Sequence, residues 1–332
     1  MSQEFITISN TEEIPRTNDR IDIRVRGRKF YDLTDVNVRA LSVSDETCVV
    51  PPECLEEYEG GYISSALLER LPNLKVLTVS ILIGSWIPPT LRELTVTTEG
   101  AIGDAIDCAN LEKLKIHVSY KLINTENLKS LCLVSGISEG VYGTVQDLSG
   151  MTSLTDLTID DADIRFKPPQ SVLRLYAEVL DVSVLKEMPN LVELEVNTLI
   201  GEVELPNSLR VLTINNSPIL PDHRVINCLY LEDVTVHHDY ILVNTVDLKR
   251  LSIGQDFKDE QIFYLLPSLT HLTLVDRPLE GKFEMIKNLE VLDLVHCDER
   301  AADVKFPASL KKIIQHGSEH EFPGCAFENV IC

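Results

Sequence analysis

The sequence repeats one short phrase, L-x-x-L-x-apolar, along most of its length. In the stretch LPNLKVLTVSILIGSWIPPTLRELTV (71–96), the phrase begins at Leu74 and again at Leu91. Alternating apolar residues at positions 4 and 6 of the phrase predict a strand with one buried face. A single strand cannot bury that face, so we expect successive coils to stack into a parallel sheet over a shared core. The leading residues are Val38, Leu74, Leu91, Leu111, Leu128, Leu154, Val172, Leu191, Leu209, Leu231, Leu248, Leu269, Leu289 and Leu310.

From Leu74 onward the phrase returns every 17 to 26 residues. This period and the repeated pattern resemble those of the leucine-rich repeat superfamily, and the resemblance covers residues 38–318. The resemblance implies an α/β repeat solenoid, a curved horseshoe with a parallel β-sheet on its concave side. The family phrase usually ends in an Asn or Cys at position 9 that links neighbouring coils, and only Cys297 matches it here. A divergent, short-repeat member is therefore expected.

The segments that connect one strand to the next have two kinds of sequence pattern. SSALLERLPNL, VSVLKEMPNL and DEQIFYLLPSL each predict a short amphipathic helix that ends before proline. SWIPPTL, RFKPPQSVL, VELPNSL and VKFPASL predict extended returns instead. The convex side should thus mix short helices with extended segments.

Three domains are expected. Residues 1–37 should form an N-terminal β cap, residues 38–318 a solenoid of about fourteen coils, and residues 319–332 a C-terminal cap or tail. Within the cap, RIDIRVRGRK (20–29) is interpreted as the solvated face of a hairpin. The long interval between Val38 and Leu74 is either a degenerate coil or an insertion.

Charge and composition limit the classes of partner and of function that are expected for this chain. The 332 residues carry 52 acids against 30 Lys and Arg, a formal net charge of -22, which opposes binding to nucleic acid or to an anionic membrane. A protein partner with basic or polar contacts suits this surface better. There is no signal-peptide pattern or long apolar run, and the eight cysteines lack metal-ligand spacing, which predicts an intracellular protein, cytoplasmic or nuclear, with reduced thiols. No catalytic, metal or cofactor motif is recognised, so a non-enzyme without a cofactor is expected.

The phrase also predicts which side chains face outward. Counting the leading residue as position 1, positions 3, 5 and 7 lie on the concave face, and position 5 is mostly Thr or Ser, as suits an exposed strand. The coils at Leu154, Val172 and Leu191 depart from this pattern, with acids around one Arg and one Tyr, the residue types that anchor interfaces. These candidates are Asp156, Asp160, Asp161, Arg174, Tyr176, Glu178, Glu193 and Glu195. The alternative is that an acidic protein simply carries acids on every face.

Histidines gather at or beside the outward positions: His117, His237, His238, His271, His296 and His316. A metal site is disfavoured because His237 and His271 are two coils apart, roughly 10 Å at the strand spacing, whereas zinc ligands lie near 2 Å from the metal. Surface histidines are expected, with a pH-sensitive interface between 231 and 316 as the alternative. His237, His271 and Asp293 complete the predicted partner-binding set.

The sequence therefore predicts a non-catalytic scaffold that grips a protein partner on its concave face. Two alternatives stay open. One is the substrate-recognition subunit of a ubiquitin-ligase assembly or a host-directed bacterial effector. The other is an enzyme with an unrecognised site in the acidic Asp156–Glu195 region. The oligomeric state does not follow from the sequence.

Overall fold

The computed structural model describes residues 6–8, 21–26, 30–44, 48–99, 105–134, 145–161, 164–201, 204–216, 225–238, 240–255, 257, 266–276, 283–297, 304–316 and 330–331. The chain divides into two compact units, Met1–Ser171 and Val172–Cys332. Each unit is a parallel solenoid, and each is described by itself below.

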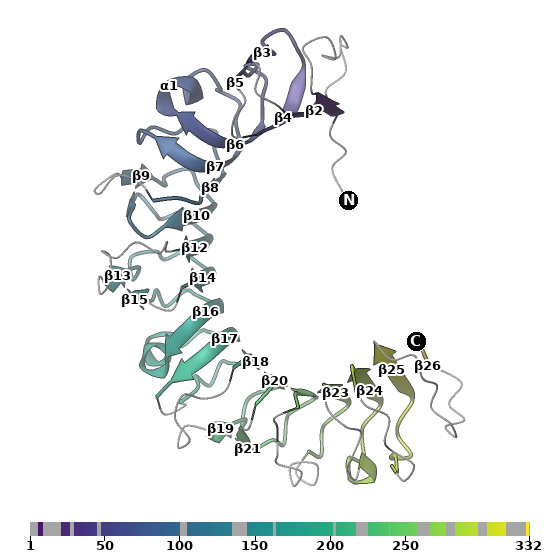
Figure 1. Cartoon of the computed structure of the whole chain (residues 1–332). Helices are drawn as coiled ribbons and strands as arrows, with labels where there is room; N and C mark the ends of the chain where they lie inside the picture. The colour runs from purple at the N-terminus through teal and green to yellow at the C-terminus, as the bar shows by residue number, and fades with distance from the viewer. Residues whose placement is uncertain are drawn as a thin grey trace. The chain divides into compact units, whose positions relative to one another are not determined.

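Unit 1 contains a ladder of parallel strands, and the phrase provides most of them (Figure 1). In order of pairing these are β1 (Ile6–Ile8), β2 (Ile21–Val25), β4 (Val38–Val43), β6 (Glu57–Ser64), β7 (Val76–Ile83), β8 (Glu93–Val96), β10 (Lys113–His117), β12 (Ser130–Val134) and β14 (Asp156–Asp160). On the return side, short parallel pairs form between β3 (Phe30–Asp32) and β5 (Cys48–Val50), β9 (Ala105–Asp107) and β11 (Lys121–Ile123), and β13 (Val145–Asp147) and β15 (Arg165–Lys167). One helix, α1 (Ser65–Leu68), follows β6.

Unit 2 repeats this design. Its ladder runs through β16 (Arg174–Asp181), β17 (Glu193–Ile200), β18 (Val211–Ile214), β20 (Asp233–Val236), β22 (Arg250–Ile253), β23 (His271–Val275), β24 (Val291–Val295), β25 (Lys312–His316) and β26 (Val330–Ile331). Its return side carries the parallel pair β19 (Val225–Asn227) and β21 (Ile241–Val243), and the 3-10 helices η2 (Val182–Glu187) and η5 (Phe283–Met285).

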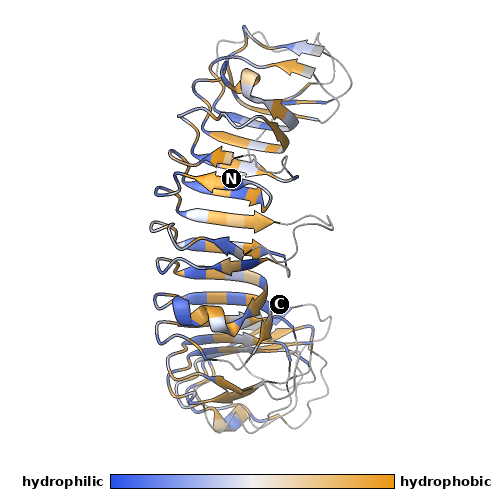
Figure 2. Cartoon of the chain, turned by 90° about the vertical axis from the view of Figure 1, so that its left-hand side faces the viewer, coloured by the Kyte–Doolittle hydropathy of each residue, from blue (hydrophilic) through white to orange (hydrophobic). Residues whose placement is uncertain are grey.

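The core consists of the apolar positions 1, 4 and 6 of every coil. In one coil these are Leu111, Leu114 and Ile116, and their side chains are 0, 2 and 0% exposed. Apolar and polar residues alternate along the ribbons (Figure 2). Because parallel pairing keeps equal positions in register from strand to strand, the buried residues form continuous columns through each unit.

The N-terminal segment corrects one interpretation. Strand β2 pairs in parallel with both β1 and β4, so the interpretation of residues 20–29 as a hairpin is wrong. Buried Ile23 and Val25 occupy positions 4 and 6 of a further coil. The interval after Val38 contains a degenerate coil, with Leu55 at position 1 and Tyr58 at position 4. The cap boundary at residue 37 stays a prediction, and residues 317–329 lie outside the described part of the chain.

The short helices predicted in the segments that connect the strands are confirmed only in small part. Helix α1 and helix η2 precede Pro72 and Pro189, as their wording predicts, but α1 has 4 residues and η2 is a 3-10 helix. The third segment, DEQIFYLL, falls almost entirely outside the described residues. In the part of the chain that the structure describes, helix is limited to these short pieces and η5, so a mixed convex side stays a prediction.

The hydrogen bonds between coils use a position that the family phrase does not predict. In several coils the residue just before the leading residue donates a side-chain hydrogen bond to a backbone carbonyl of the preceding coil. For example, the Asn127 amide donates to the Ala109 carbonyl at 2.7 Å, and the Ser208 hydroxyl donates to the Leu191 carbonyl at 2.7 Å. Further bonds of this kind come from Asn73, Thr90, Ser171, Asn288 and Ser309. Cys297 acts as its family position implies, since its thiol donates to the Leu274 carbonyl at 3.3 Å.

The element order also shows an internal duplication. Strands β6 and β7, each of 8 residues, are matched by β16 and β17, also of 8 residues. Each pair encloses a short helix with its own N-cap, Ser64 for α1 and Asp181 for η2. Glycines with positive φ, Gly84 and Gly201, follow β7 and β17. We call residues 55–171 the first block and residues 172–288 the second block.

Two coils of the blocks correspond without a gap. AIDCANLEKLKIHVSYKLINTENLKSL (105–131) aligns with VINCLYLEDVTVHHDYILVNTVDLKRL (225–251). Asn124 and Asn244 share positive φ values of 54 and 58°, and each donates at 3.0 Å to the side chain of residue 107 or 227. Cys108 and Cys228 are buried, and burial raises the pKa of each thiol to about 12. The boundary between the blocks coincides with the boundary between the units.

Candidate functional site

Each ladder has an open face made by positions 3, 5 and 7 of its coils. Along β17, for example, Leu194 and Val196 are buried, whereas Glu193 and Glu195 are exposed. The backbone donors and acceptors of these strands are used by the neighbouring strands, so the open face presents side chains and not unpaired backbone groups.

In unit 2 the structure brings together five of the predicted residues. Register places Arg174 beside Glu193 and Tyr176 beside Glu195 on the adjacent strands β16 and β17. Arg174, Glu193 and Glu195 are exposed, and Tyr176 is half-buried. The following strand, β18, presents Val211 beside Glu193 and Thr213 beside Glu195. We call Arg174, Tyr176, Glu178, Glu193 and Glu195 the acidic surface.

Side-chain hydrogen bonds hold one edge of the acidic surface. The Asn197 amide donates to the Glu178 carboxylate, and the Asn197 carbonyl accepts from the Asn215 amide at 2.9 Å. Position 7 of three successive coils is thus linked, which fixes the Glu178 carboxylate before any partner arrives. Among the described residues, no ion pair includes Glu193 or Glu195.

The predicted aspartates belong to unit 1. Asp156 and Asp160 lie on β14, where Asp156 is half-buried and Asp160 is exposed. The Asp156 carboxylate accepts from the Thr155 hydroxyl at 2.6 Å. Asp161 follows β14 and is half-buried. The predicted central patch is therefore divided between two units.

The remaining predicted residues are spread along unit 2 rather than gathered. His237 follows β20 at position 7, whereas His271 stands at position 3 of β23, with β22 between them. Burial and the neighbouring His238 lower the pKa of His237, whereas the charge of Asp276 acts to raise it. His271 is exposed and its Nδ1 lies 2.9 Å from the Thr270 hydroxyl.

Asp293 lies on the next strand, β24, beside Thr273 of β23, with its Oδ1 3.5 Å from Nε2 of His316. Among the described residues, no group of three or more His, Cys, Asp or Glu side chains could hold a metal ion.

His117 does not face outward as its position in the phrase suggests. Its side chain is only 2% exposed, and its Nδ1 accepts from the Ser119 backbone N–H at 3.2 Å. Burial lowers the pKa of this imidazole, with Glu99 and Asp161 acting in the opposite direction. Its place among the outward histidines is therefore wrong.

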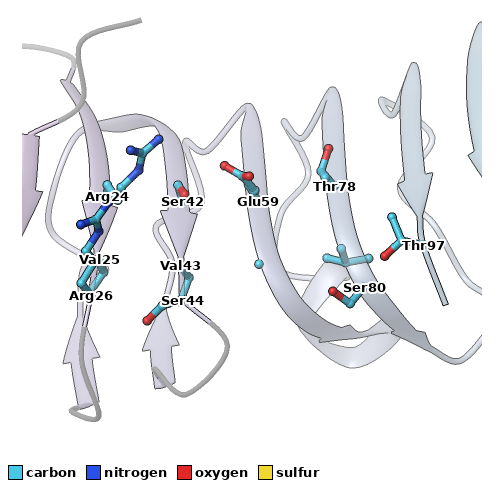
Figure 3. Close-up of a pocket in the computed structure, with 12 residues that line it drawn as sticks. Arg24, Val25, Arg26, Ser42, Val43, Ser44, Glu59, Thr78, Ser80 and Thr97 are labelled. Atoms are coloured by element: carbon cyan, nitrogen blue, oxygen red, sulfur yellow. The ribbon is translucent and has the colours of Figure 1, made fainter.

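A hollow on the open face of unit 1 was not anticipated. It extends from Arg24 on β2 and Arg26 just after β2 to Thr97 beyond β8 (Figure 3). The sequence did contain a signal, because Arg24 and Arg26 flank buried Val25 in the alternation of RIDIRVR (20–26). That signal was missed because the segment was assigned to a hairpin and not to a coil.

Exposed apolar side chains adjoin this region. Tyr62 on β6 pairs in register with Ile81 on β7, and their exposed fractions are 52 and 45%. Ile83 and Trp86 continue the apolar surface at 55 and 41%. None of the described helices is long and apolar enough to cross a membrane.

The sequence matches no protein-family profile and no curated protein. Solved structures with a similar arrangement include CroV588, described as a circular leucine-rich-repeat protein, with a TM-score of 0.49 and 18% identity over 95% of this chain. The chain spans 60% of the length of CroV588. An internalin, InlF of Listeria monocytogenes, gives a TM-score of 0.44 at 16% identity, over 91% of this chain and 87% of the internalin. YopM of Yersinia enterocolitica gives 0.27 at 15%, over 94 and 85% of the two chains.

The architecture itself identifies the class of protein. Parallel strands carry the L-x-x-L-x-apolar phrase, the phrase supplies the core, and Cys297 makes the expected bond between coils. These features are those of a leucine-rich-repeat solenoid, as the sequence predicts.

Proposed function

We propose that this chain is a non-catalytic recognition scaffold and that the acidic surface of unit 2 binds a protein partner through basic side chains. The supporting observation is the comparison between blocks. Where the second block has Glu193 and Glu195, the first has Val76 and Thr78 on an equally ordered strand. The fold is compatible with either pair, so the acids are not required for folding.

The chemistry of the acidic surface suits a basic partner. Its three carboxylates carry opposite charge to Lys and Arg, and half-buried Tyr176 offers an aromatic contact next to them. The bond from Asn197 to Glu178 means that part of the surface needs little ordering on binding, which favours affinity. We propose further contacts at Asp156, Asp160, His237, His271 and Asp293. We also propose that the protein is intracellular. The alternatives of a ligase subunit, an effector and an enzyme stay predictions, because no described feature favours one of them.

Affinity capture from a lysate tests the proposal. We expect the double variant Tyr176→Ala/Glu195→Lys to lose the partners that the wild type recovers, because it removes the aromatic contact and reverses one charge. Thr235→Ser on the same open face is the matched control and should recover the wild-type set. Equal recovery by the double variant, with an unchanged thermal midpoint, would show that the acidic surface is not the binding site.

A further inference from the structure

A pocket of about 500 Å³ lies on the return side of unit 1, and its volume is within the range of small-ligand sites. It forms where the extended segment 85–89 passes the end of β9, a return-side strand of the next coil (Figure 1). The pocket is outside the open face, and it is separate from the acidic surface, which belongs to unit 2. Its lining includes Trp86, Ile87, Pro88, Pro89, Asp107 and Asn110.

The second block has a pocket at the equivalent place. Pro206 corresponds to Pro88, and residues 227 and 230 correspond to residues 107 and 110. This pocket is smaller, with a volume of about 260 Å³. Each pocket contains one acid and one large aromatic ring, which are Asp107 and Trp86 in the first block. In the second block they are Glu204 and Tyr230.

The chain's own cations occupy the acid and the ring of the second pocket. The Lys186 Nζ lies 2.8 Å from the Glu204 carboxylate. The guanidinium carbon of Arg210 lies over the Tyr230 ring, 5.9 Å from its centroid, which is a cation–π contact. An acid and a ring placed in this way therefore attract cationic side chains where the chain supplies them.

The acid and the ring of the first pocket have no such cation. The Trp86 side chain is 41% exposed, and Asp107 is exposed. The Asp107 Oδ1 accepts only from neutral donors, the Ala109 backbone N–H and the Asn124 amide, both at 3.0 Å. Within the described ranges, no Lys or Arg side chain pairs with Asp107 or lies over the Trp86 ring.

Two sequence differences between the blocks explain this contrast. SALLERLPNL (65–74) aligns with VSVLKEMPNL (182–191), so Glu69 stands where the second block has Lys186. Arg92 corresponds to Arg210, but residue 110 is Asn and offers no ring to it. Arg92 does not line the pocket, and its Nη1 donates to the carbonyls of Pro89, Leu91 and Asn110 at 3.0, 3.1 and 3.2 Å.

Helix α1 holds Trp86 in place beside an apolar surface. The Trp86 backbone N–H donates to the Ser65 hydroxyl at 3.2 Å, and that hydroxyl lies 3.3 Å from the Ile83 carbonyl. Ile83 is 55% exposed, so an apolar side chain could pack on it next to the pocket. The second block has Val182 in place of Ser65 and lacks this bond.

We propose that the pocket beside Trp86 binds an arginine side chain of a protein partner, with an apolar residue next to that arginine packed on Ile83. The guanidinium stacks on the Trp86 ring and donates to the Asp107 carboxylate, because a planar cation can make both contacts at once. Asp107 is the only charged side chain in the lining, and the net charge of -22 also favours a cation. The proposal does not rest on the acidic surface.

The fluorescence of Trp86 tests this assignment, because it is the single tryptophan of the chain. The probes are acetyl-Ser-Leu-Arg-Leu-Ser-amide and two relatives with citrulline or lysine in place of arginine. Citrulline keeps the shape of arginine and removes its charge. We expect the arginine peptide to change the fluorescence of the full chain saturably, and the citrulline peptide to bind about fivefold more weakly or less.

Variants locate the binding energy. Asp107→Asn introduces the residue of the second block and should raise Kd about two- to fivefold. Trp86→Leu, measured by titration calorimetry, should raise Kd about threefold or more. Asp147→Asn is the matched control, because Asp147 ends the return strand β13 and accepts from the Ser149 N–H as Asp107 accepts from Ala109. It should leave Kd unchanged, as should Glu195→Lys in unit 2, and every variant should keep the wild-type thermal midpoint.

Four results would overturn the proposal. An unchanged fluorescence with the arginine peptide would mean that the pocket does not bind it. Equal affinity for the citrulline peptide would mean that no charge is recognised. Equal or tighter binding of the lysine peptide would mean that the planar guanidinium is not selected. A loss of affinity in Asp147→Asn as large as that in Asp107→Asn would mean that net charge alone attracts the probe.

Discussion

The two blocks use the same internal design and present different surfaces. Leu77 and Val79 on β7 are as buried as Leu194 and Val196 on β17, all at 1% exposure or less. On the open face between them, Val76 and Thr78 correspond to Glu193 and Glu195. At neighbouring positions, Glu59 and Gly61 correspond to Tyr176 and Glu178. The buried side chains are thus constrained by packing, while the open-face side chains are free to differ between the blocks.

The largest effect should follow from breaking the shared core. Leu128 and Leu248 hold equivalent places in the two blocks, and both are 0% exposed. Leu128→Ala and Leu248→Ala should each lower the free energy of unfolding by about 2–5 kcal/mol, because each leaves a cavity. Urea denaturation followed by circular dichroism measures this. Tolerance of one substitution and not the other would show that the blocks are not packed alike.

A smaller loss is expected from the bonds between coils. Asn127→Ala and Asn288→Ala each remove an amide that donates to a carbonyl of the preceding coil, at 2.7 and 2.6 Å. Each should cost about 1 kcal/mol of unfolding free energy. Asn110→Ala is the control, since in the described part of the chain the Asn110 side chain is not among those with a hydrogen bond. A control as destabilised as the two variants would contradict the assigned role.

Two histidines at equivalent places in the blocks predict that the free energy of unfolding depends on pH. The pKa of both His117 and His237 is lowered by burial from the ordinary value of 6.5. The unfolded chain therefore binds protons more readily than the folded chain, so stability is complete above that value and is lost as pH falls below it. Unfolding free energies measured between pH 7 and 5 should decrease, and less so in His117→Asn. An unaltered slope in that variant would contradict burial of this imidazole.

The smallest effect should come from ion pairs that both blocks carry at position 2. Lys129 lies 2.8 Å from Glu112, and Lys249 lies 2.6 Å from Glu232. The hydrogen bond from each lysine lowers the pKa of its carboxyl partner. Because these pairs are exposed and screened by water, Glu112→Gln and Glu232→Gln should leave the urea midpoint unchanged. A clear downward shift of that midpoint in either variant would give these pairs a structural role.

The sequence predicted the ladder wherever a leucine or valine opened the phrase, because the pattern is set by burial. It left the interval around Leu55 open between a degenerate coil and an insertion, because Tyr58 and Gly60 stand where two aliphatic residues are expected, and one ring fills the volume of both. It assigned residues 20–29 to a hairpin of a β cap and not to a coil, because alternation in a short segment suits both. The acidic residues were correctly placed on the open face of β16 and β17, but their division between units depends on compactness, which the phrase does not encode.

Exchange of open-face residues between the blocks tests whether Glu193 and Glu195 bind the partner without contributing to the fold. The variant Glu193→Val/Glu195→Thr gives β17 the residues of β7 while keeping Leu194 and Val196 in the core. We measure its thermal midpoint and its partner recovery by quantitative mass spectrometry in the same preparation. We predict an unchanged midpoint together with loss of the partners that the wild type recovers. Retention of the same partners at an unchanged midpoint would contradict a binding role of the two glutamates.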